Sequence, residues 1–160
     1  MTLLENVSVG FYARTKSGFF DAILRTPRQK REERMVFAKS QALLVFVGLA
    51  GKDNEAAGNL SYGSQKRLEI ARALASEPRL LLLDEPAAGM NAGEKEEITA
   101  LIRKIRKQNI AVLIIEHDMK VVMPLCDRVI VMDEGKKIAE GKPEEIQSNP
   151  RVIQAYLGEG

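Results

Sequence analysis

The chain has 160 residues, of which 45% are hydrophobic and 29% are charged, and its formal net charge is +2. This length and composition are typical of one soluble globular domain and exclude a disordered or low-complexity chain. The longest nearly unbroken apolar stretch, residues 42–50, is too short to cross a bilayer as a helix, and the first ten residues lack the pattern of a signal peptide. The single cysteine, Cys126, excludes an internal disulfide.

Positive charge is concentrated between residues 11 and 40. This window holds eight Lys or Arg and three Asp or Glu, so it carries +5 and the remainder of the chain −3. A basic window can bind anionic lipid or nucleic acid, but it is more often a solvated helix face. We interpret it as a solvated face and predict no nucleic-acid partner.

The first half of the chain is predicted to be mainly helical. Its segments are a helix over residues 3–13, an irregular insertion over 15–26, a long helix over 28–47, a polar connector over 52–59 and a helix that Ser61 caps and that runs to about residue 76. In the long helix, apolar residues such as Met35, Ala42 and Phe46 recur at helical spacing. Gly10 weakens the prediction of the first helix, because glycine disfavours helix interiors.

The second half alternates between strands and helices. Its segments are a strand over residues 80–83, a helix from Asn91, a strand over 111–115, a short helix over 119–125, a strand over 128–132 paired in a hairpin with 136–140, and helices over 143–147 and 150–157. The leucine run at 80–83 does not alternate with polar residues, which predicts a strand buried on both faces. Asn91 and Glu94 form a capping-box pattern. This order predicts an α/β fold with a mostly parallel sheet.

Two acidic residues, Asp84 and Glu85, follow the leucine strand directly. Ligands of α/β sheets gather beyond the carboxyl ends of the strands. An aspartate there can hold Mg²⁺ beside nucleotide phosphates, and the adjacent glutamate can orient or deprotonate an attacking water. Two acids before a proline could also simply begin a loop, but the four leucines before them make that interpretation the weaker one.

Three further positions are candidates for the same chemistry. Ser61 begins a helix whose free N–H groups can bind an anion, and Gly63 lets a phosphate approach closely. For Ser61 and Gly63 alone, a plain helix cap is the favoured interpretation. His117, the only histidine, also follows a strand and could contact a terminal phosphate or the attacking water. Asn91 is equally well explained as a helix cap or as a polar residue near a subunit seam.

These motifs together resemble the C-terminal half of an ATPase subunit of the ATP-binding cassette (ABC) transporters. Residues 60–65 (LSYGSQ) match the signature loop, residues 80–86 (LLLLDEP) the Walker B strand, residues 88–91 (AGMN) the D-loop and residues 114–119 (IIEHDM) the switch-histidine region. Their order and separations make the combination specific. The opening of the chain and its tail look closest to the LivG-type subgroup of branched-chain amino acid importers.

The resemblance implies a truncated P-loop NTPase fold of the ABC type. Residues 1–76 would be the helical subdomain with the signature helix, and residues 77–160 the C-terminal part of the ATPase core with its hairpin and final helices. In this family two ATPase subunits enclose two ATP molecules and dock on transmembrane permease subunits. We therefore expect a second ATPase subunit and permease subunits as partners, and a peripheral location at the cytoplasmic face of the inner membrane.

The resemblance also implies a role for each site residue. Glu85 and His117 would be catalytic, and Asp84 would hold Mg²⁺, at the ATP bound by their own chain. At the seam with the partner subunit, the nucleotide-binding residues would be Ser61, Gly63, Ser64, Gln65 and Asn91.

The sequence departs from the family pattern in two places. It contains no Walker A loop, G-x-x-x-x-G-K-S/T, whose backbone and lysine hold the phosphates of ATP. In the signature loop, Ser64 replaces a glutamine that the subgroup usually has. We interpret the chain as a fragment, or as the product of a lost or misassigned start, and predict that it does not hydrolyse ATP alone. We also expect strands 80–83 and 111–115 to be exposed on an edge or face, because the first strand of the core sheet is missing.

Two other functions stay open. The chain could be a non-catalytic partner that donates Ser61 and Gly63 to an intact ATPase subunit, or that competes for the membrane docking site. ATPases of DNA repair and chromosome maintenance share the signature, Walker B and D-loop motifs. However, the long heptad coiled coils that flank their sites are not found in this sequence.

Overall fold

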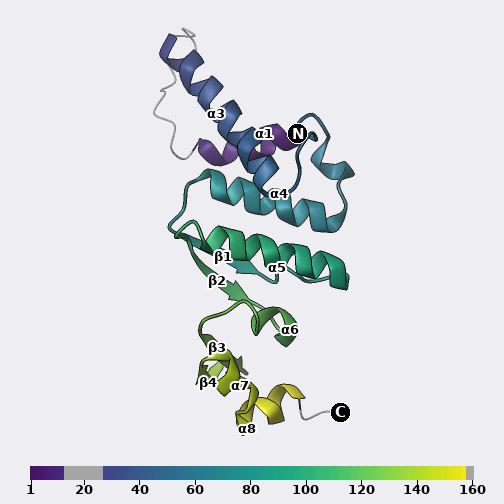
Figure 1. Cartoon of the computed structure of the whole chain (residues 1–160), viewed down its shortest axis with the longest axis vertical. Helices are drawn as coiled ribbons and strands as arrows, with labels where there is room; N and C mark the ends of the chain where they lie inside the picture. Colours follow the sequence, from purple (N-terminus) through teal and green to yellow (C-terminus); the bar gives the residue numbers. More distant parts are fainter. Residues whose placement is uncertain (13–26, 158–160) are drawn as a thin grey trace. The chain divides into compact units, whose positions relative to one another are not determined.

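The computed structural model describes residues 1–12 and 27–157, so the predicted insertion over 15–26 lies outside the described residues. The elements are α1 (Leu3–Phe11), α3 (Pro27–Phe46), η1 (Ala57–Asn59), α4 (Tyr62–Ala75), β1 (Leu80–Asp84), α5 (Ala92–Arg106), β2 (Ala111–Ile115), α6 (Met119–Val122), β3 (Val129–Asp133), β4 (Lys136–Gly141), α7 (Pro143–Gln147), α8 (Pro150–Val152) and η2 (Ile153–Leu157). Figure 1 labels all of them except η1 and η2. No described helix combines the length and the apolar character that crossing a membrane requires.

The chain divides into two compact units. The first comprises Met1–Leu83 and Gly89–Leu113, and the second comprises Asp84–Ala88 and Ile114–Gly160. The predicted boundary after residue 76 follows the subdomains of the family rather than this division, and it stays a prediction.

In the first unit, α1 packs against both α3 and α4. The buried side chains of these helices include Leu3, Val7, Phe11, Leu44, Leu68, Ala71 and Leu74. At Gly10 the backbones of α1 and α4 come close together, since a Cβ there would overlap the Arg72 carbonyl oxygen and lie 2.7 Å from the Cβ of Ala75. The glycine that weakens the sequence prediction of this helix is therefore required by its packing.

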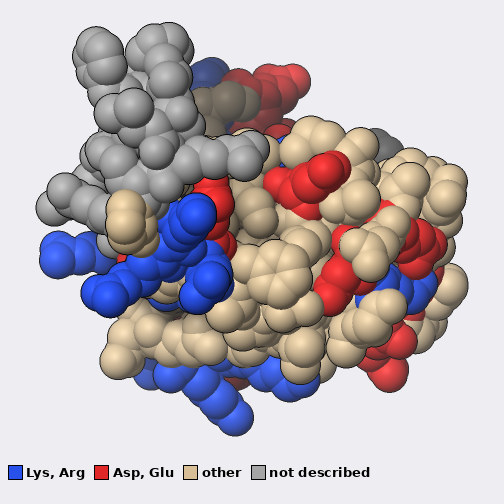
Figure 2. Space-filling view, turned by 90° about the horizontal axis from the view of Figure 1, so that it is seen from above, with Lys and Arg blue, Asp and Glu red and all other residues tan. Residues whose placement is uncertain are grey.

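The basic first half of α3 is exposed. Lys30, Arg31 and Arg34 all lie at the surface. Figure 2 shows Lys and Arg side chains at the left of the face it draws, along its lower edge and at its right. Glu33, between them in the sequence, is exposed as well. This arrangement agrees with the interpretation of the basic window as a solvated helix face.

Side-chain caps fix where several helices begin. Before α1, Thr2 and Glu5 form a capping box, in which each side chain accepts from the other residue's backbone N–H at 3.2 and 2.8 Å. Asn91 and Glu94 form the predicted capping box before α5, with distances of 3.0 and 3.1 Å. The predicted cap of α4, Ser61, is confirmed as well. These caps satisfy N–H groups that helix ends otherwise leave without partners.

β1 and β2 form a two-stranded parallel pair. At their starts the Ala111 N–H donates to the Arg79 carbonyl at 3.0 Å, and at their ends the Glu85 N–H donates to the Ile115 carbonyl at 2.9 Å. Because start pairs with start and end with end, the strands run in the same direction. The predicted parallel pairing is confirmed.

The prediction that the leucine strand is buried on both faces is wrong. Side-chain exposure alternates along β1: Leu80 and Leu82 are 53% and 64% exposed, whereas Leu81 is 4% exposed. On β2, Leu113 is 55% exposed. The separate expectation that these strands present an exposed face is confirmed, because in the described residues nothing covers these leucines.

The second unit is built on an antiparallel hairpin of β3 and β4. Its small core contains the buried Val131, Ala139, Ile146 and Val152 from β3, β4, α7 and α8. The Tyr156 hydroxyl in η2 donates to the Met132 carbonyl at 2.6 Å, which ties the last helical turn to β3. The hairpin is as predicted, but the short helix before it ends at Val122 rather than near residue 125. Within residues 27–157, β3 pairs with β4 and not with the parallel pair.

Candidate functional site

The end of β1 places Asp84 and Glu85 in solvent-exposed positions of the second unit. Glu85 has a positive φ of 44°, a left-handed conformation that costs a non-glycine residue about 1 kcal/mol or more. Its N–H bond to the Ile115 carbonyl holds this backbone in place. Such strain occurs at functional sites and also in ordinary turns, as at Glu134, where φ is 45°.

His117 lies against Glu85, as the sequence interpretation requires. The Nδ1 atom of His117 is 3.3 Å from Oε1 of Glu85, and the two side chains are 67% and 53% exposed. Exposed pairs of this kind contribute little to stability. The pair is therefore expected to add little to the stability of the fold.

A buried carboxylate that sequence reasoning missed, Glu116, supports both segments. Its side chain is only 1% exposed. Oε1 accepts from the Ala87 N–H at 3.0 Å, and Oε2 accepts from the His117 N–H at 3.2 Å. Glu116 therefore links the loop after Glu85 to the segment that carries His117. The only signal in the sequence was an acid directly after an apolar strand, which gave no indication of burial.

The donor set at this edge fits Mg²⁺ only in part. Asp84 offers one exposed carboxylate, and no group of three or more His, Cys, Asp or Glu side chains among the described residues could hold a metal ion. Mg²⁺ at nucleotide sites commonly takes one or two protein carboxylates and completes its shell with phosphate oxygens and water. Asp84 fits that limited role.

At the start of α4, in the first unit, the signature residues bond to one another. The Ser61 hydroxyl lies 3.1 Å from that of Ser64, and it accepts from the Ser64 N–H at 3.4 Å. Ser64 is only 8% exposed. The Arg67 guanidinium donates to the Ser64 hydroxyl at 3.1 Å and to Glu97 of α5 at 3.0 Å. Of the two serines, Ser61 is the one at the surface.

The other residues predicted to bind nucleotide have different surroundings. Gly63 is buried, and a Cβ there would lie 3.1 Å from a carboxylate oxygen of Glu94. The Gln65 amide turns back to donate to the Leu60 carbonyl at 3.0 Å. Asn91 is exposed and caps α5. In this conformation Ser61 and Asn91 are the members of the predicted set that solvent reaches most readily.

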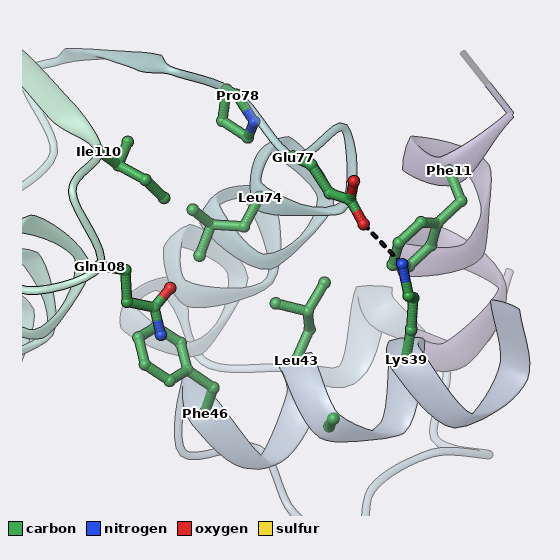
Figure 3. Close-up of a pocket in the computed structure, with 10 residues that line it drawn as sticks. Phe11, Lys39, Leu43, Phe46, Leu74, Glu77, Pro78, Gln108 and Ile110 are labelled. Atoms are coloured by element: carbon green, nitrogen blue, oxygen red, sulfur yellow. Dashed lines mark hydrogen bonds and ion pairs between the residues drawn. The ribbon is translucent and has the colours of Figure 1, made fainter. Parts of the chain in front are cut away.

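A cavity lies elsewhere in the first unit. It measures about 530 Å³ and is lined mainly by apolar side chains, including Leu43, Phe46 and Leu74 (Figure 3). At its side Lys39 pairs with Glu77 at 2.6 Å and lies 5.8 Å from the centre of the Phe11 ring. None of the predicted site residues lines it.

Family models match two segments of the chain. A model described as "ABC transporter" matches residues 2–88, and one described as "Branched-chain amino acid ATP-binding cassette transporter" matches residues 136–160. Together they cover the signature loop, the Walker B strand and the tail.

Similar proteins match over almost the whole chain. The high-affinity branched-chain amino acid transport ATP-binding proteins LivG of Salmonella typhimurium and BraF of Pseudomonas aeruginosa are each 45% identical over 160 residues, which are 99% of this chain and 63% of the relative. The crystal structure of MJ1267, an ATP-binding cassette of an ABC transporter, in its ADP conformation has a TM-score of 0.80 at 33% identity, over 99% of this chain and 63% of that one. The chain thus spans less than two thirds of the length of these proteins.

Proposed function

This chain belongs to the ABC transporter family of ATP-binding proteins, and from that premise we propose that it forms the signature and Walker B part of an importer ATPase subunit. Its fold is that of the ABC ATPase domains. The intact subunit would couple ATP binding and hydrolysis to solute uptake. The observation that carries this proposal is the contact between His117 and Glu85 at the carboxyl edge of the strands.

Each residue at this edge would have its own role in ATP hydrolysis. Glu85 would accept a hydrogen bond from the attacking water and polarise it towards the terminal phosphate. His117, 3.3 Å from that carboxylate, would orient it and contact the phosphate. ATP would supply the phosphoanhydride bond that is broken. Asp84 would hold Mg²⁺, which would neutralise part of the negative charge of the phosphates.

The start of α4 would serve a different nucleotide, one held by a partner subunit. Ser61 is exposed at the positive end of a helix of 14 residues, so its hydroxyl and the nearby N–H groups can meet a γ-phosphate. Gly63, Ser64 and Gln65 would take part after Gln65 releases the Leu60 carbonyl. Asn91 would lie at the seam between the subunits.

The solute, the partners and the cellular location are inferred from the relatives. LivG and BraF are named as branched-chain amino acid transport proteins, and the tail of this chain matches a family model of the same description. We extend to this chain branched-chain amino acids as the transported solute, a second ATPase subunit and permease subunits as partners, and a peripheral place at the cytoplasmic membrane face. Residues 1–76 would be the helical subdomain that docks on the permease.

The 160 residues by themselves are not expected to hydrolyse ATP, because they contain no Walker A sequence. A P-loop supplied from elsewhere should restore turnover. The test is a chimera in which the part of the Salmonella typhimurium relative that this chain does not match is fused ahead of Met1.

In the chimera we expect Mg²⁺-dependent ATP hydrolysis that Glu85→Gln lowers about 100-fold or more, because the carboxylate acts as the base. Glu134→Gln is the matched control, since Glu134 is also exposed with a positive φ, of 45°. Turnover that survives Glu85→Gln, or that Glu134→Gln lowers equally, would contradict the proposal.

A second candidate function is a non-catalytic module that donates its signature face to an intact subunit. The exposed position of Ser61 favours it. The chain would be mixed with a form of the Salmonella typhimurium relative in which the residue aligned with Ser61 is replaced by arginine. Recovery of ATP turnover on mixing would support donation, provided that Ser61→Arg abolishes the recovery and Ser148→Arg, at an exposed serine of the second unit, does not.

A further inference from the structure

The cavity of about 530 Å³ in the first unit combines an apolar interior with one positive and one negative side chain. Lys39 and Glu77 pair there at 2.6 Å, and Figure 3 shows them facing each other at one side of the cavity. Leu43 and Leu74 lie between this pair and Ile110 at the opposite side. Small-molecule sites usually have volumes of about 300–1,000 Å³ and a mostly apolar lining with a few charged or polar groups. The cavity has both properties.

The pair of Lys39 and Glu77 can exchange its partners at low cost. The two side chains are 48% and 47% exposed, and exposed pairs of this kind contribute little to stability. The Lys39 ammonium also lies 5.8 Å from the centre of the Phe11 ring, a contact that attracts it to this side of the cavity. A ligand with one carboxylate and one ammonium can therefore replace the single ion pair with two, each reinforced by a charge-assisted hydrogen bond.

The position of the two charges restricts the class of ligand. An α-amino acid carries its ammonium and its carboxylate on one carbon atom, so both groups reach the same side of the cavity when the side chain enters it. A simple carboxylate would take Lys39 from Glu77, and a simple amine would take Glu77 from Lys39, so each breaks the pair and restores only one contact. The apolar lining disfavours a charged ligand side chain, because burying an unpaired charge is costly.

We propose that this cavity binds an α-amino acid with an apolar side chain. The carboxylate of the ligand accepts from Lys39, its ammonium donates to Glu77, and its side chain packs on the apolar lining. The class of ligand follows from the cavity, whereas the choice of a branched-chain amino acid rests on the proposed function, which names that solute. Leu74 lies in the last turn of α4, so the amino acid contacts the helix that Ser61 caps.

The test is equilibrium dialysis of the 160-residue chain against radiolabelled L-leucine at neutral pH without nucleotide. We expect saturable binding. Glycine keeps both charges without the apolar side chain, isocaproate keeps the side chain and the carboxylate, and isoamylamine keeps the side chain and the ammonium. Each of the three should compete at least about 10-fold more weakly than leucine, because each loses either the apolar contact or one ion pair.

Substitutions of the charged pair test the polar contacts. Lys39→Met removes the charge and keeps an apolar stem, and Glu77→Gln removes the charge at nearly the same size. Each should raise the Kd for leucine at least about 10-fold. Lys66→Met is the matched control, because Lys66 pairs with Glu69 at 3.0 Å and lies 5.7 Å from the centre of the Tyr62 ring. Lys66 does not line the cavity, so its variant should bind leucine as the wild type does.

A bulky substitution tests the cavity itself. Ala42 and Ala38 are both exposed on α3, but only Ala42 lines the cavity. Ala42→Trp should block leucine binding, whereas Ala38→Trp should not. Circular dichroism verifies that each variant folds, and saturating leucine should raise the unfolding temperature of the wild type and of Ala38→Trp but not of Ala42→Trp.

Three results would overturn the proposal: no saturable binding by the wild type, competition by glycine equal to that by leucine, or the same Kd for the variants at Lys39, Glu77 and Lys66. If a charge variant unfolds, the ligand series on the wild type decides in its place. Weaker competition by isocaproate and isoamylamine then supports the site, and competition equal to that by leucine overturns it.

Leucine binding and ATP hydrolysis fail separately. The dialysis contains no ATP and the hydrolysis assay contains no leucine, so Glu85→Gln is expected to bind leucine as the wild type does. Leucine binding together with an inactive chimera would leave the cavity site standing and remove the proposed function. An active chimera whose chain binds no leucine would do the reverse.

Discussion

The start of α4 and the end of β1 carry most of the predicted site residues, and their local structures differ in kind. At the start of α4, Ser61 caps a helix, and Ser64 is buried and bonded to Arg67. At the end of β1, Asp84 and Glu85 are exposed, and Glu85 has a left-handed backbone. The first arrangement stabilises the fold through a cap and hydrogen bonds, whereas the second includes a strained backbone.

The difference separates two kinds of functional evidence. A residue that stabilises the fold, such as the helix cap Ser61, can also bind a ligand with no change in its geometry. A residue such as Glu85 has a conformation that opposes stability, and this strain can be measured by substitution. Substitutions at the two places should therefore change the free energy of unfolding in opposite directions.

The largest loss of stability is expected at Glu116, which links the loop after β1 to the segment after β2. Glu116→Ala leaves the N–H groups of Ala87 and His117 without their buried acceptor and should lower the free energy of unfolding by about 3 kcal/mol. Urea denaturation followed by circular dichroism measures this. Glu116→Gln keeps one acceptor oxygen and should lose less. An alanine variant as stable as the wild type would show that the strand end does not depend on this carboxylate.

The helical side is expected to be most sensitive at Gly10. Gly10→Ala introduces a Cβ that collides with α4 and should lower the free energy of unfolding by about 2 kcal/mol despite the better helix propensity of alanine. Gly58→Ala is the matched control, because a Cβ there meets no atom within 4 Å. Equal effects of the two substitutions would mean that α1 and α4 can separate at no cost.

At the start of α4, Ser61→Ala should lower the free energy of unfolding by about 1 kcal/mol through loss of the cap. Ser61→Asp keeps a capping oxygen and should leave stability within about 0.5 kcal/mol of the wild type. Its negative charge should nevertheless abolish the recovery of ATP turnover in the mixing assay. If Ser61→Asp supports turnover, Ser61 is a cap and nothing more.

At the end of β1 we expect a substitution to raise the free energy of unfolding rather than lower it. Glu85→Gly relieves the left-handed strain and should raise the free energy of unfolding by about 0.5 kcal/mol, after the higher entropy of glycine in the unfolded chain is subtracted. Glu134→Gly, at a hairpin-turn residue with a φ of 45°, should give a similar gain. In the chimera only Glu85→Gly should remove activity. A loss of stability at Glu85 alone would contradict the interpretation of strain.

Local signals predicted much of the fold. The cap at Ser61, the capping box of Asn91 with Glu94 and the hairpin of β3 with β4 each depend on residues close in sequence, and each is present. The proximity of His117 to Glu85 was also predictable, because parallel strands bring their carboxyl ends to one edge.

Contacts between distant segments were not predictable in the same way. The burial of Glu116 depends on the loop after β1 folding over it, and the need for Gly10 depends on the approach of α4. The leucine run predicted that both faces of β1 are buried, but the face that carries Leu82 is exposed. The composition of a strand indicates which surroundings suit it, but not which segments lie against it. In each case the deciding neighbour is far away in the sequence.

The hydrogen bonds of Arg67 limit which substitutions this region can accept in evolution. Its guanidinium donates to the Ser64 hydroxyl and to Glu97 at once, so one side chain joins the signature loop to α5. Glutamine at position 64 would need more room than this 8% exposed site offers, and Arg67 would have to release one of its acceptors. Positions 64, 67 and 97 should therefore covary among homologues, with serine at 64 accompanied by arginine and glutamate at the other two.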